Sequence, residues 1–120
     1  CFHRVVKDFI IQAGQSDKES TRYLREQIGN YKIPPEFRKY KHKKGYLSSA
    51  RRWNNNPFKQ SDPYEFFIVH KKEGLHHLDN EHTVFGKVIK GMNVINKIAN
   101  EAIDKGEWPI KDIDITVTAY

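Results

Sequence analysis

Hydrophobic and polar residues alternate in short runs along most of the chain, and this period of two is typical of β-strands. The first two runs, FHRVV at 2–6 and FIIQA at 9–13, are expected to form a hairpin, with Lys7 and Asp8 as its two-residue turn. Three further strands are expected over residues 45–50, 65–72 and 83–89. The second of these, EFFIVHKK, is rich in aromatic and β-branched residues, which favours a buried strand.

Two segments have the three- and four-residue spacing of helices. The first covers 20–29 (STRYLREQIG), where Ser20 is expected to cap the helix and Gly29 to end it. In the second, apolar residues recur at Met92, Ile95, Ile98, Ala99 and Ala102. That spacing predicts an amphipathic helix with one face against the core. Residues 111–120 (KDIDITVTAY) alternate again, which predicts a half-buried final strand.

The composition is that of one folded domain. The chain has 120 residues, of which 38% are hydrophobic and 12% aromatic, and this is enough for a single core. No run approaches the roughly 18 consecutive apolar residues of a membrane-spanning helix, and no signal peptide is visible. Cys1 is the one cysteine, so an internal disulfide is excluded. Because the chain does not begin with Met, we expect a processed product or a piece of a longer chain.

The net charge of +6 is unevenly distributed. Residues 1–60 contain 14 Lys and Arg against 5 Asp and Glu, whereas residues 61–120 contain 7 against 10. A basic run lies near the middle of the chain and comprises Arg38, Lys39, Lys41, Lys43, Lys44, Arg51 and Arg52. Such a run can contact nucleic acid or an anionic surface. No nucleic-acid motif accompanies it, so the sequence favours a solvated loop, and nucleic-acid binding is not expected.

Polar side chains interrupt the apolar hairpin at both ends. His3 and Arg4 lie in its first strand, and Gln12 lies in its second. Such groups either face water at a rim or converge on a ligand. Hydrophobic patterning does not decide between these two alternatives.

Three histidines close together in the sequence raise the alternative of a metal site, at His76, His77 and His82. Their spacing fits no standard zinc pattern, and no Cys is nearby. We therefore expect no metal there. Asp79 and Glu81 of the same stretch are expected to be loop residues.

Four motifs together resemble one family in their order and approximate spacing: FHRVVKDFIIQAG at 2–14, GYLSSA at 45–50, EFFIV at 65–69 and LDNEHTVFGKVIKGMNVINKI at 78–98. The family is the cyclophilin-type peptidyl-prolyl cis-trans isomerases. The resemblance runs from Phe2 to about Tyr120 and is weakest over 15–32 and 51–64. The segments IPPEF and HKKGYLSSAR are similar to those of bacterial members, which implies the bacterial periplasm or cytoplasm as the location.

The resemblance implies a mainly β fold, a closed antiparallel β-barrel of eight strands with a helix from the C-terminal half capping one end. Residues 1–120 are then a single domain. The family's first two strands and first helix have no counterpart in this chain, so the domain is expected to be N-terminally incomplete. A barrel without those strands has two open edges.

The resemblance also implies a functional site. The residues expected to be catalytic are Arg4, Phe9, Gln12, Phe67 and His82. The residues expected to bind substrate are Ile10, Ala50, Arg51, Glu65, His77 and Leu78. Arg4 would stabilise a twisted prolyl amide, Gln12 would bind the substrate backbone, and His3 would pack behind the wall. No metal or other cofactor is implied, and the expected partners are proline-containing polypeptides.

Three of these positions depart from the family pattern. One of them, Arg51, stands where many members have asparagine, although bacterial relatives often have arginine there. Glu65 stands where a glutamine is usual; as a carboxylate it only accepts hydrogen bonds, and it is a candidate partner for Arg4. His77 stands where many members have tryptophan. The loss of an indole predicts weak or no binding of cyclosporin-type macrocycles. The loop 51–64 also lacks the glycine-rich turn of the family.

Three functions follow, in order of preference. The first is a peptidyl-prolyl cis-trans isomerase that acts on X-Pro bonds and assists protein folding. The second is a module of the same fold that binds proline-containing peptides with little or no turnover, as the departure at Glu65 suggests. The third is a nucleic-acid contact through residues 38–52, which would depend steeply on salt.

Overall fold

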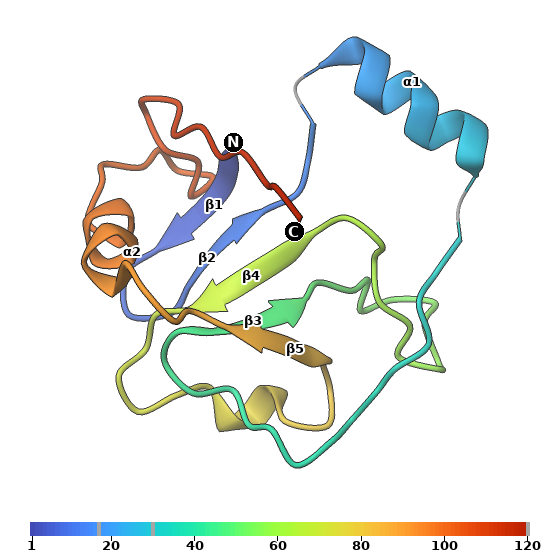
Figure 1. Cartoon of the computed structure of the whole chain (residues 1–120), viewed down its shortest axis with the longest axis horizontal. Helices are drawn as coiled ribbons and strands as arrows, with labels where there is room; N and C mark the ends of the chain where they lie inside the picture. The colour runs from blue at the N-terminus through green and yellow to red at the C-terminus, as the bar shows by residue number, and fades with distance from the viewer. Residues whose placement is uncertain (17, 30, 120) are drawn as a thin grey trace.

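The computed structural model describes residues 1–16, 18–29 and 31–119, whose strands form one antiparallel sheet (Figure 1). The elements in chain order are β1 (Phe2–Val6), β2 (Ile10–Ala13), α1 (Glu19–Ile28), β3 (Tyr46–Ser49), β4 (Phe66–Val69), a 3₁₀ turn (His76–Leu78), β5 (Val84–Lys87) and α2 (Met92–Ala99). The mainly β architecture with a helix in the C-terminal half is therefore confirmed. Each expected strand between residues 2 and 89 is present. The first has the expected bounds and the others are shorter, most of all β4, which was expected over 65–72.

The sheet has the strand order β1-β2-β4-β3-β5. The hairpin turn lies where the sequence predicts it. The Phe9 N–H donates to the Val6 carbonyl at 3.1 Å, and Asp8 takes a left-handed φ of 58°. Gly14 follows β2 with a φ of +116°. A Cβ there would lie 2.3 Å from the Tyr64 carbonyl oxygen, so glycine allows the chain before β4 to approach the end of β2.

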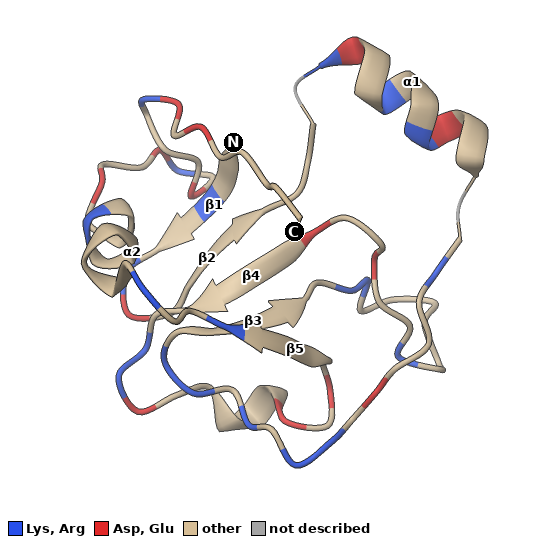
Figure 2. Ribbon diagram, viewed as in Figure 1, with Lys and Arg blue, Asp and Glu red and all other residues tan. Residues whose placement is uncertain are grey.

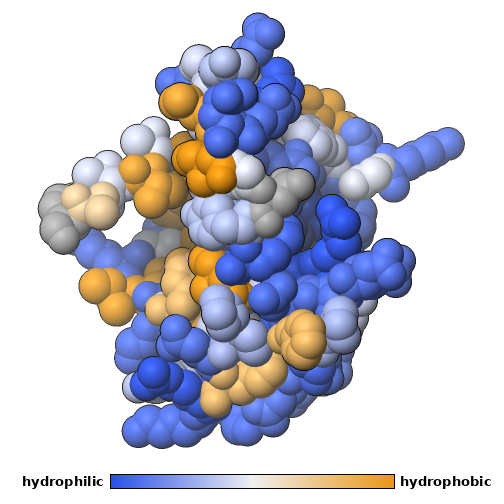
Figure 3. Space-filling view, turned by 90° about the vertical axis from the view of Figure 1, so that its right-hand side faces the viewer, coloured by the Kyte–Doolittle hydropathy of each residue, from blue (hydrophilic) through white to orange (hydrophobic). Residues whose placement is uncertain are grey.

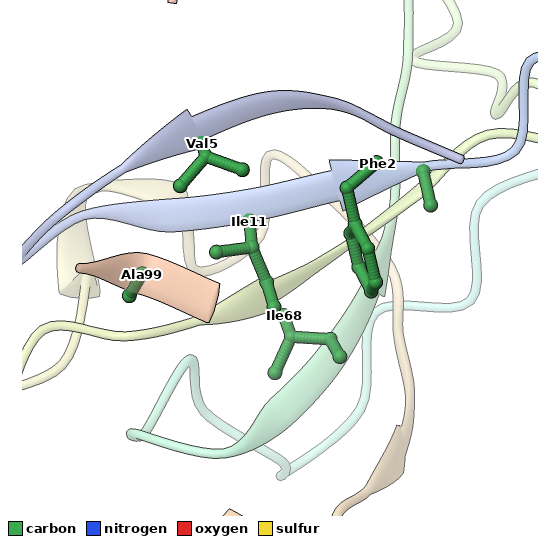
Figure 4. Packing of buried hydrophobic residues seen from close by; sticks show 6 residues of the cluster. Phe2, Val5, Ile11, Ile68 and Ala99 are labelled. Carbon is green, nitrogen blue, oxygen red and sulfur yellow. The ribbon is translucent and has the colours of Figure 1, made fainter. Parts of the chain in front are cut away.

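Alternate residues of the strands face opposite sides of the sheet, as the period of two requires. One side carries the main core, in which Ile11 and Ile68 pack with Phe2, Val5 and Ala99 (Figure 4). A second apolar cluster contains Ile10, Phe67, Val69, Leu75 and Leu78. Consecutive residues of one strand therefore pack in different clusters: Ile10 and Ile11 of β2 lie on opposite sides of the sheet, and so do Phe67 and Ile68 of β4.

The two α-helices differ in how they pack. Helix α2 lies against β1 and β2, with Ala99 buried and Ile95 and Ile98 packed on the main core (Figure 1). Helix α1 buries no residue and stands away from the sheet (Figure 1). Gly29 ends α1 as expected, but the predicted cap at Ser20 is wrong, because the helix begins at Glu19. Within the described ranges, neither helix has the length and apolar character needed to cross a bilayer.

The C-terminal prediction is only partly right. Helix α2 ends at Ala99 and does not reach Ala102. Residues 111–119 form no assigned strand, contrary to the prediction for 111–120, and Tyr120 lies outside the described residues. Ile113 and Ile115 nevertheless pack against the main core, and the Ile113 carbonyl accepts a hydrogen bond from the Phe2 N–H at 3.0 Å. In the strand order, β1 and β5 stand at the two ends.

Candidate functional site

A pocket of about 260 Å³ lies on the side of the sheet that carries Phe67. The hairpin, the end of β3, β4 and the 78–82 loop all contribute to it. Its lining residues are Arg4, Phe9, Ile10, Gln12, Ala50, Arg51, Trp53, Phe67, Leu78 and His82. The strand register explains part of this gathering, since Gln12 is paired with both Arg4 and Phe67 across the sheet.

The Arg4 guanidinium is held at the rim of this pocket. Its Nε–H donates to the Glu107 carboxylate at 3.0 Å, and its Cζ lies 5.4 Å from the centre of the Phe9 ring. Both partners of the ion pair are partly exposed. The prediction that Glu65 pairs with Arg4 is wrong, because the Glu65 carboxylate lies 3.0 Å from His3 Nε2 instead. The fixed Nε–H leaves the Nη groups of Arg4 as the donors for a ligand.

The hairpin turn that carries Phe9 is tied to two other elements. The Asp8 N–H donates to His70 Nδ1 at 2.9 Å, and His70 Nε2 lies 3.1 Å from the side-chain oxygen of Asn96 in α2. Since Nδ1 accepts a hydrogen bond, the proton of a neutral His70 ring is on Nε2 and is donated to Asn96. The His70 N–H also donates to the Phe9 carbonyl at 2.8 Å. These bonds hold one wall of the pocket in place.

Phe67 and His82 form the aromatic floor of the pocket. Their ring centres are 5.4 Å apart and the rings meet edge to face. His82 Nδ1 donates to the Ser49 carbonyl at 3.0 Å. Burial lowers the pKa of His82 to about 4, although the hydrogen bond to Ser49 opposes this shift. The imidazole is therefore neutral at pH 7 and is suited to an uncharged ligand.

A buried hydrogen-bonded chain supports this floor from behind. The His42 ring stacks on Phe67 at 6.0 Å, and its Nδ1 and Nε2 lie 2.8 Å from Asp79 and Ser48 respectively. Burial lowers the pKa of His42, against the opposing hydrogen bond to Asp79. A neutral ring donates from Nδ1 to the carboxylate, so the Ser48 hydroxyl donates to Nε2.

The hydrogen-bonded series of Asp79, His42 and Ser48 supports the pocket floor and is not a nucleophilic triad. Ser48 is fully buried, and its hydroxyl also lies 3.1 Å from the Thr83 carbonyl oxygen. The Asp79 carboxylate additionally accepts from the His42 backbone N–H at 2.8 Å and from His76 Nδ1 at 2.9 Å. Burial raises the pKa of Asp79, but these hydrogen bonds outweigh it and hold the pKa below its usual value. Asp79 is thus more than the loop residue expected from the sequence.

An ion-pair cluster fixes the loop on the other side of the pocket. The Glu81 carboxylate accepts from Arg51 at 2.8 Å and from Lys59 at 2.9 Å. The hydrogen bond from Lys59, assisted by the charge of Arg51, lowers the pKa of Glu81. The Arg51 guanidinium lies 4.3 Å from the centre of the Trp53 ring, which meets His82 at 5.3 Å.

Nine of the eleven residues predicted from the sequence line this one pocket, and two do not. His77 is exposed and lies outside the lining. Glu65 lines a separate, larger hollow of about 1020 Å³ together with Leu47 and Phe66. The expectation that His3 packs behind the wall is confirmed, because it is buried and contacts Glu65. The catalytic and binding roles of the nine remain predictions.

Three important residues were missed from the sequence: Trp53, Glu107 and His42. Trp53 lies in the loop where the resemblance is weakest. Glu107 is separated from Arg4 by 103 residues, and His42 from Asp79 by 37, so no local pattern connects them. The Asn-rich loop offered no specific signal for Trp53, because single hydrophobic residues are common on protein surfaces.

The basic run of residues 38–52 lies mainly on loops, which Figure 2 shows in blue before and after β3. Arg51 is not part of a solvated surface, because its side chain is 4% exposed and paired with Glu81. Arg38 is exposed and lies 3.3 Å from Glu36. From the side shown in Figure 3, hydrophilic residues are interspersed with hydrophobic ones, and the hydrophobic ones also reach the surface. Nothing in this distribution singles out a nucleic-acid interface.

Comparison with known proteins adds a family match. The family model described as cyclophilin type peptidyl-prolyl cis-trans isomerase/CLD matches residues 1–119. Peptidyl-prolyl cis-trans isomerase 9 of Caenorhabditis elegans is 36% identical over 115 residues, which are 96% of this chain and 35% of that protein. Peptidyl-prolyl cis-trans isomerase CYP18-2 of Arabidopsis thaliana is 37% identical over 119 residues, which are 98% of this chain and 67% of that protein.

Solved structures of cyclophilin-type isomerases also resemble this chain. The crystal structure of a cyclophilin type peptidyl-prolyl cis-trans isomerase of Cryptosporidium parvum has a TM-score of 0.70 and 29% sequence identity, covering 92% of this chain and 65% of that one. A second crystal structure of that protein, in the presence of the dipeptide Ala-Pro, has a TM-score of 0.68 and 28% identity, covering 91% and 66%. The chain thus spans about a third of the first curated relative and about two thirds of the solved chain.

Proposed function

The chain belongs to the cyclophilin-type peptidyl-prolyl cis-trans isomerase family, and from this premise we propose that it catalyses the cis/trans isomerisation of X-Pro bonds in peptides and proteins. The pocket that contains Arg4 and Phe67 is the proposed active site. Its substrates are proline-containing polypeptides, and its proposed biological role is to assist protein folding. The crystal structure of a relative in the presence of Ala-Pro supports this class of ligand.

The reaction breaks no covalent bond. Its barrier of about 18–20 kcal/mol comes from the partial double-bond character of the amide. Uncatalysed exchange at X-Pro takes tens to hundreds of seconds. A catalyst needs to bind the proline and to stabilise the twisted amide more than either planar form.

Arg4 is the proposed source of that stabilisation. In the twisted state the prolyl nitrogen regains a localised lone pair, which a guanidinium N–H can bind. The charge of arginine is constant across the physiological pH range, so no proton transfer is needed. The Nε–H is bound to Glu107 at 3.0 Å, and the Nη groups are the proposed donors to substrate.

The remaining pocket residues have proposed roles in binding. Phe67, Leu78 and neutral His82 offer an apolar socket for a proline ring, with Phe9 and Ile10 forming the wall beside it. Gln12 has an amide that both donates and accepts, and it is proposed to bind the substrate backbone. Ala50 and Arg51 border the pocket at the end of β3. None of these roles requires a metal or an acid–base catalyst.

The observation that carries the proposal is the convergence of Arg4 and Gln12 on a pocket floored by Phe67 and His82. The test is NMR exchange spectroscopy of an Ala-Pro peptide with catalytic amounts of the chain. Accelerated exchange between the cis and trans signals is the expected result. Peptide-induced shifts at Phe67 without acceleration would instead indicate a binding module, and neither response from a folded chain would remove the proposal.

A further inference from the structure

Trp53 is the pocket residue for which the proposed reaction has no use. Its side chain is 62% exposed although it borders the same pocket as Phe67 and His82. The indole is a large apolar surface that is open to solvent at a pocket, and exposed apolar surface of this kind is found where ligands bind. Stabilisation of the twisted amide is assigned to Arg4 in the proposed function, and Trp53 has no part in it.

The indole is held in place and does not depend on a ligand for its position. The Arg51 guanidinium lies against it, with 4.3 Å between Cζ and the ring centre, and the Arg51 side chain is 4% exposed. Arg51 is in turn bound to Glu81 at 2.8 Å. The His82 ring meets the indole at 5.3 Å with an interplanar angle of 74°. Two contacts thus fix Trp53 while most of its surface remains open to solvent.

The loop that carries Trp53 is joined to the floor of the pocket. The Glu81 carboxylate bridges Arg51 at one end of this loop and Lys59 towards the other. The Lys59 ammonium also lies 3.3 Å from the Asn80 carbonyl oxygen. Asn56 adds hydrogen bonds to the Arg52 and Gln60 carbonyls, both at 2.8 Å. The loop is therefore a fixed wall, and an indole on it forms a preorganised surface.

We propose that Trp53 forms a subsite, continuous with the proline socket, that binds a large apolar or aromatic side chain next to the proline of the substrate. The proposal rests on the proposed function of the pocket. A proline seated on Phe67 and His82 leaves its neighbouring residue beside the indole, because Trp53 contacts His82 directly. Stacking on an exposed, fixed aromatic ring favours Phe or Leu over Ala at that position.

The first test compares substrate selectivity. The kcat/KM is measured for peptides with Ala, Leu or Phe before the proline, and for a second series with the same residues after it. In the unmodified chain, the ratio of kcat/KM for Phe to that for Ala is expected to exceed one in at least one series. The Trp53→Ala substitution is expected to lower this ratio roughly 3- to 10-fold, the size of an aromatic contact.

Two further variants make the result specific. Phe58 is the matched control, because it is an aromatic residue on the same loop, is 75% exposed and is not part of the pocket lining. Phe58→Ala is expected to leave both ratios unchanged. Glu81→Gln loosens the support of Arg51 and is expected to lower the ratio while Trp53 is still present. Unchanged ratios in Trp53→Ala, or an equal fall in Phe58→Ala, would overturn the proposal.

A binding measurement separates this proposal from the proposed function. The indole N–H signal of Trp53 is identified by its loss in Trp53→Ala and is followed by NMR during titration with Phe-Pro, Pro-Phe and Ala-Pro peptides. Larger shifts with a Phe-containing peptide, without faster exchange, would support the subsite and remove the isomerase. Faster exchange with neither a shift of this signal nor a change in selectivity would support the isomerase and remove the subsite.

Discussion

The Arg4 Nε–H donates to the Glu107 carboxylate at 3.0 Å and joins the first strand to a loop 103 residues later in the chain. The same guanidinium lies 5.4 Å from the centre of the Phe9 ring. These two contacts restrict a long side chain that otherwise has many rotamers. The ion pair is partly exposed, so its value lies more in orienting the guanidinium than in stabilising the fold.

Glu107 is therefore expected to be a positioning residue. Glu107→Gln keeps the size of the side chain but weakens the bond to Arg4. We expect kcat for an Ala-Pro peptide to fall about 3- to 10-fold, the value of a weakened charged hydrogen bond, with a smaller change in KM. Glu101→Gln is the matched control, because Glu101 is an exposed carboxylate of the same part of the chain. Equal kcat values for the unmodified chain, Glu107→Gln and Glu101→Gln would contradict this role.

The support behind Phe67 is expected to contribute to stability. His42 bonds to one oxygen of the Asp79 carboxylate and His76 bonds to the other. In Asp79→Asn, one of these oxygens becomes an NH2 group, which cannot accept the hydrogen bond donated there, and the negative charge is lost. The free energy of unfolding is expected to fall by about 2–3 kcal/mol, as for lost hydrogen bonds to a charged group. Urea denaturation measures this difference. Asp112→Asn at an exposed position is the control, and an equal loss in both variants would exclude a specific role for Asp79.

The pKa of His82 predicts how stability depends on pH. The folded ring has a pKa of about 4 because it is buried, whereas the unfolded chain has the ordinary value of 6.5. The unfolded state therefore binds the extra proton between these values, so the free energy of unfolding falls as the pH falls from 6.5 towards 4. The full difference for this one group is roughly 3 kcal/mol.

His82→Gln removes that titration. Its free energy of unfolding, measured by urea denaturation at several pH values, is expected to depend less steeply on pH than that of the unmodified chain in this window. His77→Gln, at an exposed position, serves as the comparison. Identical slopes for the unmodified chain and His82→Gln would mean that His82 is not held neutral by the fold.

Weak binding of cyclosporin-type macrocycles remains a prediction. His77 is exposed beside Leu78, which lines the pocket, and it stands where many relatives have an indole. His77→Trp is expected to raise the affinity for cyclosporin about tenfold by adding an aromatic surface and an N–H donor. Isothermal titration calorimetry measures the change, with His76→Trp as the neighbouring control. Tight binding by the unmodified chain would contradict the prediction.

Local pattern was sufficient to predict most of the fold. The hairpin depends on two alternating runs and a short turn, and it forms as expected with Phe9 bonded to Val6. Gly29 ends α1 because glycine readily takes the positive φ of 89° found there. The predicted strands of β3, β4 and β5 each pair with a neighbour.

The C-terminal segment shows the limit of that approach. Alternation indicates which side chains face the core, and Ile113 and Ile115 do pack there. A strand also requires a partner backbone, and alternation says nothing about whether one is present. The prediction for 111–120 was therefore right about Ile113 and Ile115, but Val117 is 75% exposed and residues 111–119 form no strand.

The site was predictable in part for a similar reason. Arg4, Gln12 and Phe67 lie in motifs that are specific to the family, and strand register brings them together. Glu107 and His42 act through contacts between distant parts of the chain, which a sequence pattern does not encode. The expected pairing of Glu65 with Arg4 failed because Glu65 lies beside His3 and lines the other hollow.

The most direct test of the account is the rate of cis/trans exchange of an Ala-Pro peptide, measured by NMR with the unmodified chain, Arg4→Ala and Arg4→Lys. Arg22→Ala, at an exposed position in α1, is the matched control. We predict that the unmodified chain and Arg22→Ala accelerate exchange equally. Arg4→Ala should reduce that acceleration at least about 100-fold, which is the effect expected when one hydrogen-bond donor to the transition state is removed. Arg4→Lys should restore little of the acceleration. Undiminished acceleration by a folded Arg4→Ala variant would contradict the central claim.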